Sequence, residues 1–186
     1  MKLRKHDKHL GGHAGITHID PGVLRYFITN HSVKSMLDVG CGPGGQVFEA
    51  KKLGLEAHGI DGDYTLDRGK DKNFFTLHDY TKGPSNLLKK VDLVWSVEFL
   101  EHVQEQFIPH FLPDLKSGKF LVVTFARPHE TGGHHHVNCN TQEYWIEKIQ
   151  DDFFKFDEIL TNEVKKVSTM TRDFIRNSAL VFSRTR

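Results

Sequence analysis

Residues 37–45 read Leu-Asp-Val-Gly-Cys-Gly-Pro-Gly-Gly, an apolar run that ends in a cluster of glycines. The run from Val33 to Val39 predicts a short buried strand, and Gln46 to Lys52 predicts a helix directly after the glycines. Glycines between a strand and a helix let a ligand approach the backbone without meeting a Cβ atom. This stretch therefore predicts the cofactor-binding turn of an α/β fold.

Strand and helix signals alternate on both sides of this turn, which predicts βαβ units and a parallel sheet. The expected strands are residues 55–60, 74–78, 91–96 and 119–126, and the expected helices are residues 21–29, 86–90, 99–111 (interrupted near Pro109) and 141–152. Two further runs, residues 154–160 and 179–183, predict a C-terminal antiparallel hairpin at one edge. We expect a Rossmann-like, mostly parallel seven-stranded sheet with helices on both faces.

Length and charge limit the possible functions. The 186 residues suit one domain, with an N-terminal arm and helix (1–30), a cofactor-binding core (31–126), and a substrate-side loop with C-terminal strands (127–186). Lys and Arg total 25 against 24 acidic residues, so the net charge of +1 gives no overall footprint for nucleic acid. The basic end from Met1 to His9 is expected to be solvated and partly frayed.

Cysteine usage and hydropathy point to a cytoplasmic protein. The two cysteines, Cys41 and Cys139, have no metal-type spacing, and the first 30 residues lack the apolar segment of a signal peptide. No apolar run of 18 residues occurs, so no membrane partner is expected.

Charge also distinguishes between two possible cofactors. Gly40, Gly42 and Gly45 satisfy the dinucleotide pattern G-x-G-x-x-G, and Asp61, at the end of the next expected strand, suits the hydroxyls of a ribose. Asp38, however, lies at the carboxyl end of the first strand, where a carboxylate is poorly placed beside a pyrophosphate. It suits a cofactor with an ammonium and a sulfonium group, and S-adenosylmethionine (SAM) carries both.

The motifs together resemble those of the class I SAM-dependent methyltransferases. Residues 37–45 look like the family's first motif, Ile60-Asp61 like its acidic second motif, and His78-Asp79 like its adenine-contacting position. Residues 92–103, Asp-Leu-Val-Trp-Ser-Val-Glu-Phe-Leu-Glu-His-Val, resemble the segment on the fourth strand. The resemblance implies that SAM is the cofactor and that its contacts come from Asp38, Gly40, Cys41, Gly42, Gly44, Asp61, Gly62, Asp79, Tyr80, Ser96, Val97 and Glu98. For Glu101-His102 it implies a packing role only.

The loop after the fifth core strand, residues 127–138, is the expected source of the chemistry, because it carries four histidines within eight residues and a glycine pair as a hinge beside the cofactor site. Histidine titrates near neutral pH and suits a general base, so His134 and His136 are the candidate catalytic residues. Two other interpretations remain open, a divalent metal site and a structural loop, although we expect no metal. Tyr144 and Trp145 on the next helix are expected to belong to the core.

The sequence therefore predicts an enzyme that methylates a small-molecule acceptor at oxygen. A nucleic-acid methyltransferase is an alternative that the basic N-terminus keeps open, although the D/N-P-P-Y/F run of base-amine methylation is missing. A SAM-binding accessory module without turnover and an NAD-dependent oxidoreductase are further alternatives.

Overall fold

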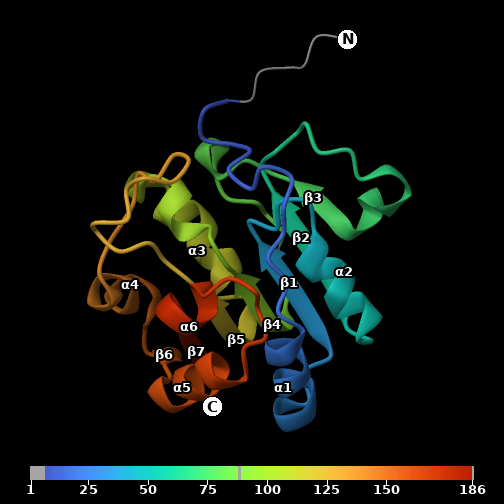
Figure 1. Ribbon diagram of the computed structural model, residues 1–186, viewed down its shortest axis with the longest axis vertical. Coiled ribbons are helices and arrows are strands. Elements are labelled where there is room, and N and C mark those ends of the chain that lie inside the picture. The colour runs from blue at the N-terminus through green and yellow to red at the C-terminus, as the bar shows by residue number, and fades with distance from the viewer. Residues whose placement is uncertain (1–6, 88, 186) are drawn as a thin grey trace.

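The computed structural model describes residues 7–87 and 89–185, which form one seven-stranded sheet with the strand order β3-β2-β1-β4-β5-β7-β6 (Figure 1). The strands are β1 (Ser35–Val39), β2 (Glu56–Asp61), β3 (Phe75–Leu77), β4 (Val91–Ser96), β5 (Gly118–Val123), β6 (Phe154–Phe156) and β7 (Leu180–Arg184). The helices are α1 (Pro21–His31), α2 (Gly45–Lys52), α3 (Ile108–Leu115), α4 (Gln142–Ile149), α5 (Glu158–Val167) and α6 (Phe174–Ser178).

Strands β1 to β5 are parallel, and β7 pairs antiparallel with both β5 and β6. The chain order reverses between β1 and β4, and at such a switch point an open α/β sheet binds its ligand. The predicted fold class is confirmed, including the antiparallel strands at the C-terminal edge.

Helices cover both faces of the sheet because neighbouring residues of each strand point to opposite sides. Met36 on β1 packs in a core cluster with residues of α1, α2, α5 and α6. Leu37, the next residue, packs in a second cluster with residues of α3 and α4. Trp145 of α4 is fully buried there, which agrees with its expected place in the core.

The C-terminal region differs from the expected hairpin because two helices, α5 and α6, separate its strands. The run expected as one strand over residues 154–160 gives only the short β6, and Asp157 then caps α5 by accepting a hydrogen bond from the backbone N–H of Leu160. Leu160 and Val164 lie one helical turn apart and are both buried. That spacing is the local signal for a helix.

Two helices expected in the middle of the chain are also wrong. Residues 99–111 form two 3₁₀ turns, Leu100–His102 and Glu105–Phe107, and α3 begins only at Ile108. Pro109 stands at the start of α3, where its missing N–H costs nothing. The described residues of the expected helix 86–90 have no regular structure; Leu88 lies outside the described residues.

The segment from Asp7 to Asp20 crosses the carboxyl ends of the central strands before α1 begins (Figure 1). His9 is hydrogen-bonded to Asp79, so the expectation of a frayed end is wrong for this residue. Residues 1–6 of the expected basic arm lie outside the described residues. No helix in the described part of the chain is both long and apolar enough to cross a membrane.

Candidate active site

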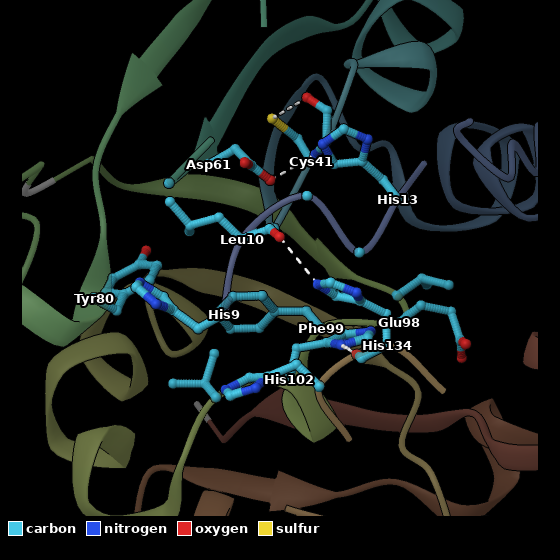
Figure 2. A pocket seen from close by; sticks show the side chains of 18 of the residues that line it. His9, Leu10, His13, Cys41, Asp61, Tyr80, Glu98, Phe99, His102 and His134 are labelled. Carbon is cyan, nitrogen blue, oxygen red and sulfur yellow. Dashed lines mark hydrogen bonds between the residues drawn. The ribbon is translucent and has the colours of Figure 1, made fainter. Parts of the chain in front are cut away.

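A cavity of about 710 Å³ opens at the carboxyl ends of β1, β2 and β4, where the predicted motifs meet. Asp61 and Cys41 lie at one end of it, His102 and His134 lie at the other, and Leu10 stands between them (Figure 2). Apart from Gly44 and Ser96, every predicted site residue lines this cavity. The structure therefore brings the cofactor motifs and the histidine loop to one place.

The glycine turn has the backbone conformation that its sequence predicts. Gly40, Gly42 and Gly44 have φ angles of +76°, +50° and +89°, which residues with a side chain rarely adopt. A Cβ atom on Gly40 would lie 2.3 Å from the ring of Phe99, so this ring packs directly on the turn. Gly44 caps α2 outside the cavity, where a Cβ atom would meet the ring of Phe75.

Asp38 and Asp61 place two carboxyl groups beside this turn. Asp61 accepts hydrogen bonds from the backbone N–H groups of Gly42 (2.7 Å) and Asp63 (2.8 Å), which fixes its orientation at the end of β2. Asp38 is buried, and burial together with the charge of Asp61 raises its pKa well above the usual value. A cation between the two carboxylates would stabilise their ionised forms, and the ammonium group of SAM is such a cation.

The 3₁₀ turn that follows β3 contributes Asp79 and Tyr80. Asp79 accepts hydrogen bonds from Thr81 and His9; burial alone would raise its pKa, but these bonds outweigh burial and lower it. Tyr80 lines the cavity with its ring, while its hydroxyl donates to Asp114 of α3 at 2.6 Å. A Cβ atom on Gly62 would lie 2.8 Å from Cδ2 of Leu10, so the N-terminal segment packs directly against this glycine.

The end of β4 supplies Ser96, Val97 and Glu98. The Ser96 hydroxyl is fully buried and donates to the carbonyl of Val39, so this predicted cofactor contact instead joins β4 to β1. Glu98 has a φ of +56°, and its backbone N–H donates to the hydroxyl of Thr124 at 2.8 Å. Burial raises the pKa of Glu98 to about 7. Val97 and Glu98 both line the cavity.

The N-terminal segment forms one wall of the cavity, which the sequence did not reveal. His9 contacts Asp79, His13 lies 3.0 Å from Asp63, and Thr17 accepts a hydrogen bond from the backbone N–H of Gly45. These contacts join positions 28 to 70 residues apart in the chain. The polar, glycine-rich composition of residues 11–15 resembled an ordinary loop, so no local signal showed which surface it covers.

The histidine loop closes the opposite end. His134 donates from Nε2 to the carbonyl of Leu10, and its own carbonyl accepts from Nδ1 of His102 at 2.7 Å (Figure 2). Nδ1 of His136 is 2.5 Å from the carbonyl of Glu130, and the rings of His102 and His136 meet edge to face, 5.0 Å apart. His134 and His136 both line the cavity, and their catalytic role stays a prediction.

Two lining residues of the C-terminal region carry no motif in the sequence. Arg172 lies between α5 and α6, Phe174 is the first residue of α6, and both reach the cavity. Arg172 lies close enough to Glu98 to lower its pKa against the larger effect of burial. Only the folding of the tail across the sheet brings these side chains to the site.

Comparisons with known proteins also point to a methyltransferase. Residues 37–123 match a family model described as a methyltransferase domain. The magnesium protoporphyrin IX methyltransferase ChlM from Synechocystis PCC 6803, solved with bound SAM, has a TM-score of 0.59 at 15% identity, over 88% of this chain and 76% of that chain. A TehB-like SAM-dependent methyltransferase from Corynebacterium glutamicum has a TM-score of 0.59 at 16% identity, over 88% of each chain.

A third similar structure is the plantazolicin methyltransferase BpumL, in complex with a triazolic desmethylPZN analog and S-adenosylhomocysteine (SAH). Its TM-score is 0.54 at 15% identity, over 89% of this chain and 83% of that chain. No curated protein sequence gives a significant match. The family model, the strand order and the shared fold agree with one another: residues 37–123 match a methyltransferase domain, and the chain has the fold of methyltransferases that use SAM.

Proposed function

We propose that this methyltransferase transfers the methyl group of SAM to an oxygen atom of a small-molecule acceptor. The observation that carries the proposal is the division of one cavity into a carboxylate-lined end and a histidine-lined end. Its volume of about 710 Å³ lies within the range of sites that bind small molecules. The carboxylates suit the cationic donor, and the histidines suit an acceptor that must lose a proton.

The cofactor would occupy the end beside the glycine turn. In this proposal Asp38 faces the ammonium group of SAM, Asp61 accepts hydrogen bonds from the ribose hydroxyls, and Asp79 lies near the adenine amino group. The backbone of Gly40 and Gly42 passes beneath the methionine part, with Val97 and Glu98 along its side. Cys41, Gly62 and Tyr80 line the same space.

Methyl transfer is a direct displacement, so the protein has to align three atoms and exclude water. A lone pair of the acceptor oxygen forms the new bond to the methyl carbon, and the bonding pair of the old bond remains on sulfur, which leaves neutral SAH. The hydroxyl proton has to be removed, and we assign this role to His134 and His136, which lie at the far end of the cavity.

The charge of the lining favours a small acceptor over a nucleic acid. Asp38, Asp61, Asp79 and Glu98 all face the cavity, and phosphate groups bind to proteins chiefly through Lys and Arg. Two of the similar structures are named for the small molecules magnesium protoporphyrin IX and plantazolicin. The two cysteines are free thiols, which is the basis for proposing a cytoplasmic location.

The test is a transfer assay with radiolabelled SAM and a cell extract separated into small molecules, nucleic acids and proteins. We expect label in the small-molecule fraction and formation of SAH. Label confined to nucleic acid or protein would refute the proposed acceptor class, and binding of SAM without any transfer would favour an accessory module.

The histidine assignment needs variants of the same loop. Replacing His134 or His136 with alanine should lower the transfer rate about 100-fold, the lower part of the usual range for a lost general base, and leave SAM affinity unchanged. His129→Ala is the matched control, because His129 is exposed on the same loop and does not line the cavity. Full activity of both cavity variants would refute the assignment.

A further inference from the structure

We propose that Glu101, His102 and His136 bind a divalent transition-metal ion at the acceptor end of the cavity. One carboxylate oxygen of Glu101 and one nitrogen from each imidazole lie within 4.8 Å of one another. Ligand atoms around a metal with bonds of about 2.0–2.2 Å lie roughly 3–3.5 Å apart, so the cluster needs a contraction of about 1–2 Å. His136 stands on a loop, where rotation of its side chain can supply this movement.

Glu101 is the first reason to expect a cation. Its side chain is 0% exposed, and neither carboxylate oxygen has a hydrogen-bond partner among the residues that the structure describes. A buried carboxyl group without a partner is costly, and proteins usually compensate such a group with a hydrogen bond, a counter-charge or a metal. The groups within 4.8 Å of its carboxylate include His102 and His136, both of which are metal ligands by type, and the charge of the nearby Glu98 makes a cation still more favourable.

The hydrogen bonds of the two histidines are the second reason. Nδ1 of His102 faces the carbonyl oxygen of His134, and Nδ1 of His136 faces that of Glu130. A carbonyl oxygen only accepts, so Nδ1 carries the proton in both rings, and Nε2 is left with a free lone pair. Metal-binding histidines are oriented in this way, with the second nitrogen donating to a carbonyl or carboxylate.

The backbone of Glu101 also positions the histidine loop. Its carbonyl oxygen accepts hydrogen bonds from the N–H groups of Val137 (2.9 Å) and Asn138 (3.1 Å). His136 therefore directly precedes a stretch of loop that is tied to the same residue that supplies the carboxylate. In addition, a Cβ atom on residue 133 would lie 2.1 Å from Nε2 of His136, so Gly133 leaves room for that ring. The three ligands are thus held close together before any ion binds.

The ligand set indicates the class of metal. Two imidazoles and one carboxylate suit Zn²⁺, Fe²⁺, Co²⁺ or Mn²⁺, whereas Mg²⁺ prefers oxygen ligands and retained water. Three protein ligands leave coordination positions open, and His102 and His136 both line the cavity. An acceptor hydroxyl can therefore reach the ion.

A role for the ion in transfer rests on the proposed function. A bound divalent ion lowers the pKa of a coordinated hydroxyl, so that the oxygen approaches the methyl carbon as an alkoxide. His136 would then act as a ligand, and the proton would pass to His134, which stands outside the ligand set. The displacement itself, in which the methyl carbon passes from sulfur to the acceptor oxygen, is the same as in the proposed function.

Metal binding can be measured without SAM or acceptor. The full-length protein is stripped of metal with a chelator and titrated with Co²⁺ and Zn²⁺ by calorimetry, and the visible absorption of Co²⁺ reports coordination by nitrogen. We expect one ion per chain. His136→Ala and the isosteric Glu101→Gln should weaken its binding at least about 100-fold, while His129→Ala on the same loop retains it.

His136 lies on a loop, so its replacement should leave the fold intact, and circular dichroism of each variant checks this point. The inference is overturned if no ion binds with a Kd below 100 μM, or if His136→Ala binds the metal as the parent protein does. A separate transfer assay keeps the two proposals distinct. Transfer by a protein that binds no metal would refute the metal site alone, and metal binding without transfer to small molecules would refute the proposed function alone.

Discussion

The two ends of the cavity are built in different ways. The cofactor end consists of residues at the carboxyl ends of β1 to β4, and backbone hydrogen bonds of the sheet hold them, as when Gly40 and Cys41 donate to the carbonyl of Ile60. The acceptor end consists of the histidine loop and the 3₁₀ turn at Leu100–His102, and the N-terminal segment lies along both ends. His134 is exposed, whereas Asp38 is buried.

This difference corresponds to a division of labour. In the proposed function, SAM binds at the rigid sheet, whereas the acceptor is recognised by loops, which tolerate sequence variation. Changes at the cofactor end should therefore alter SAM binding, and changes at the acceptor end should alter turnover. Four predictions test the cofactor end and its boundary, in order of decreasing effect.

Gly40→Ala should have the largest effect, a loss of SAM affinity of at least about 100-fold. The new methyl group would stand 2.3 Å from the Phe99 ring and would push it into the space beside the turn, and the φ of +76° adds strain. Gly54→Ala is the control, because Gly54 has a φ of +91° with nothing within 4 Å of its Cβ position. Calorimetry with SAH measures both variants, and equal affinities would show that the turn is not rigid.

Asp61→Asn should weaken SAM binding about 10–100-fold. The asparagine amide has one acceptor oxygen, so it cannot accept both the hydrogen bonds from Gly42 and Asp63 and those expected from the ribose. Hydrogen bonds to charged groups contribute about 1.5–3 kcal/mol. Asp67→Asn provides the control, since Asp67 accepts a hydrogen bond from the exposed backbone N–H of Gly69 and lies outside the cofactor cavity. If Asp61→Asn binds SAH like the parent protein, the ribose assignment is wrong.

Asp38→Asn should weaken SAM binding by about 10-fold and stabilise the cofactor-free protein. Because burial raises the pKa of Asp38 in the folded state, the folded protein binds more protons than the unfolded chain above about pH 4, and its stability falls as the pH rises. Asparagine carries no charge, so the Tm of the variant should exceed that of the parent protein by an amount that increases from pH 4 to pH 7. Thermal unfolding across this range tests the sign, and a Tm that is lower than that of the parent at pH 7 would contradict it.

His9→Ala should have the smallest effect, with release of SAM about 2–5-fold faster, because the hydrogen bond to Asp79 is partly exposed and contributes at the lower end of the usual range, about 0.5–1 kcal/mol. This variant probes the boundary between the two ends, where the N-terminal segment covers the cavity. Stopped-flow fluorescence would report the rate. An unchanged rate would mean that the segment does not retain the cofactor.

The strands and the helix around the glycine turn, together with β4, were predictable because their signals are local. Strand β4 has the predicted bounds, and β1, β2 and α2 differ from the expected ranges by at most two residues at either end. The helix at residues 99–111 was wrong because apolar residues in 3₁₀ turns can imitate a helical pattern. The strand at residues 154–160 was wrong because three aromatic residues, Phe153, Phe154 and Phe156, outweighed the helix cap at Asp157.

The acceptor end could not be predicted in the same way. Glu101-His102 was expected only to pack, and no metal was expected, because the sequence separates this pair from the histidine loop; the bond between His102 and His134 spans 32 positions. The bond between Leu10 and His134 spans 124 positions. Neither contact has a pattern that a single sequence can display.

The sequence alone determined the sheet core, the glycine turn and the acidic residues that follow its strands, because periodicity, the φ angles open to glycine and the charge of a strand end act within a few residues. The tertiary structure decided what covers the cofactor end and which buried carboxyl group meets which histidines. These contacts depend on how distant segments pack across the sheet, and no short stretch of sequence determines that packing.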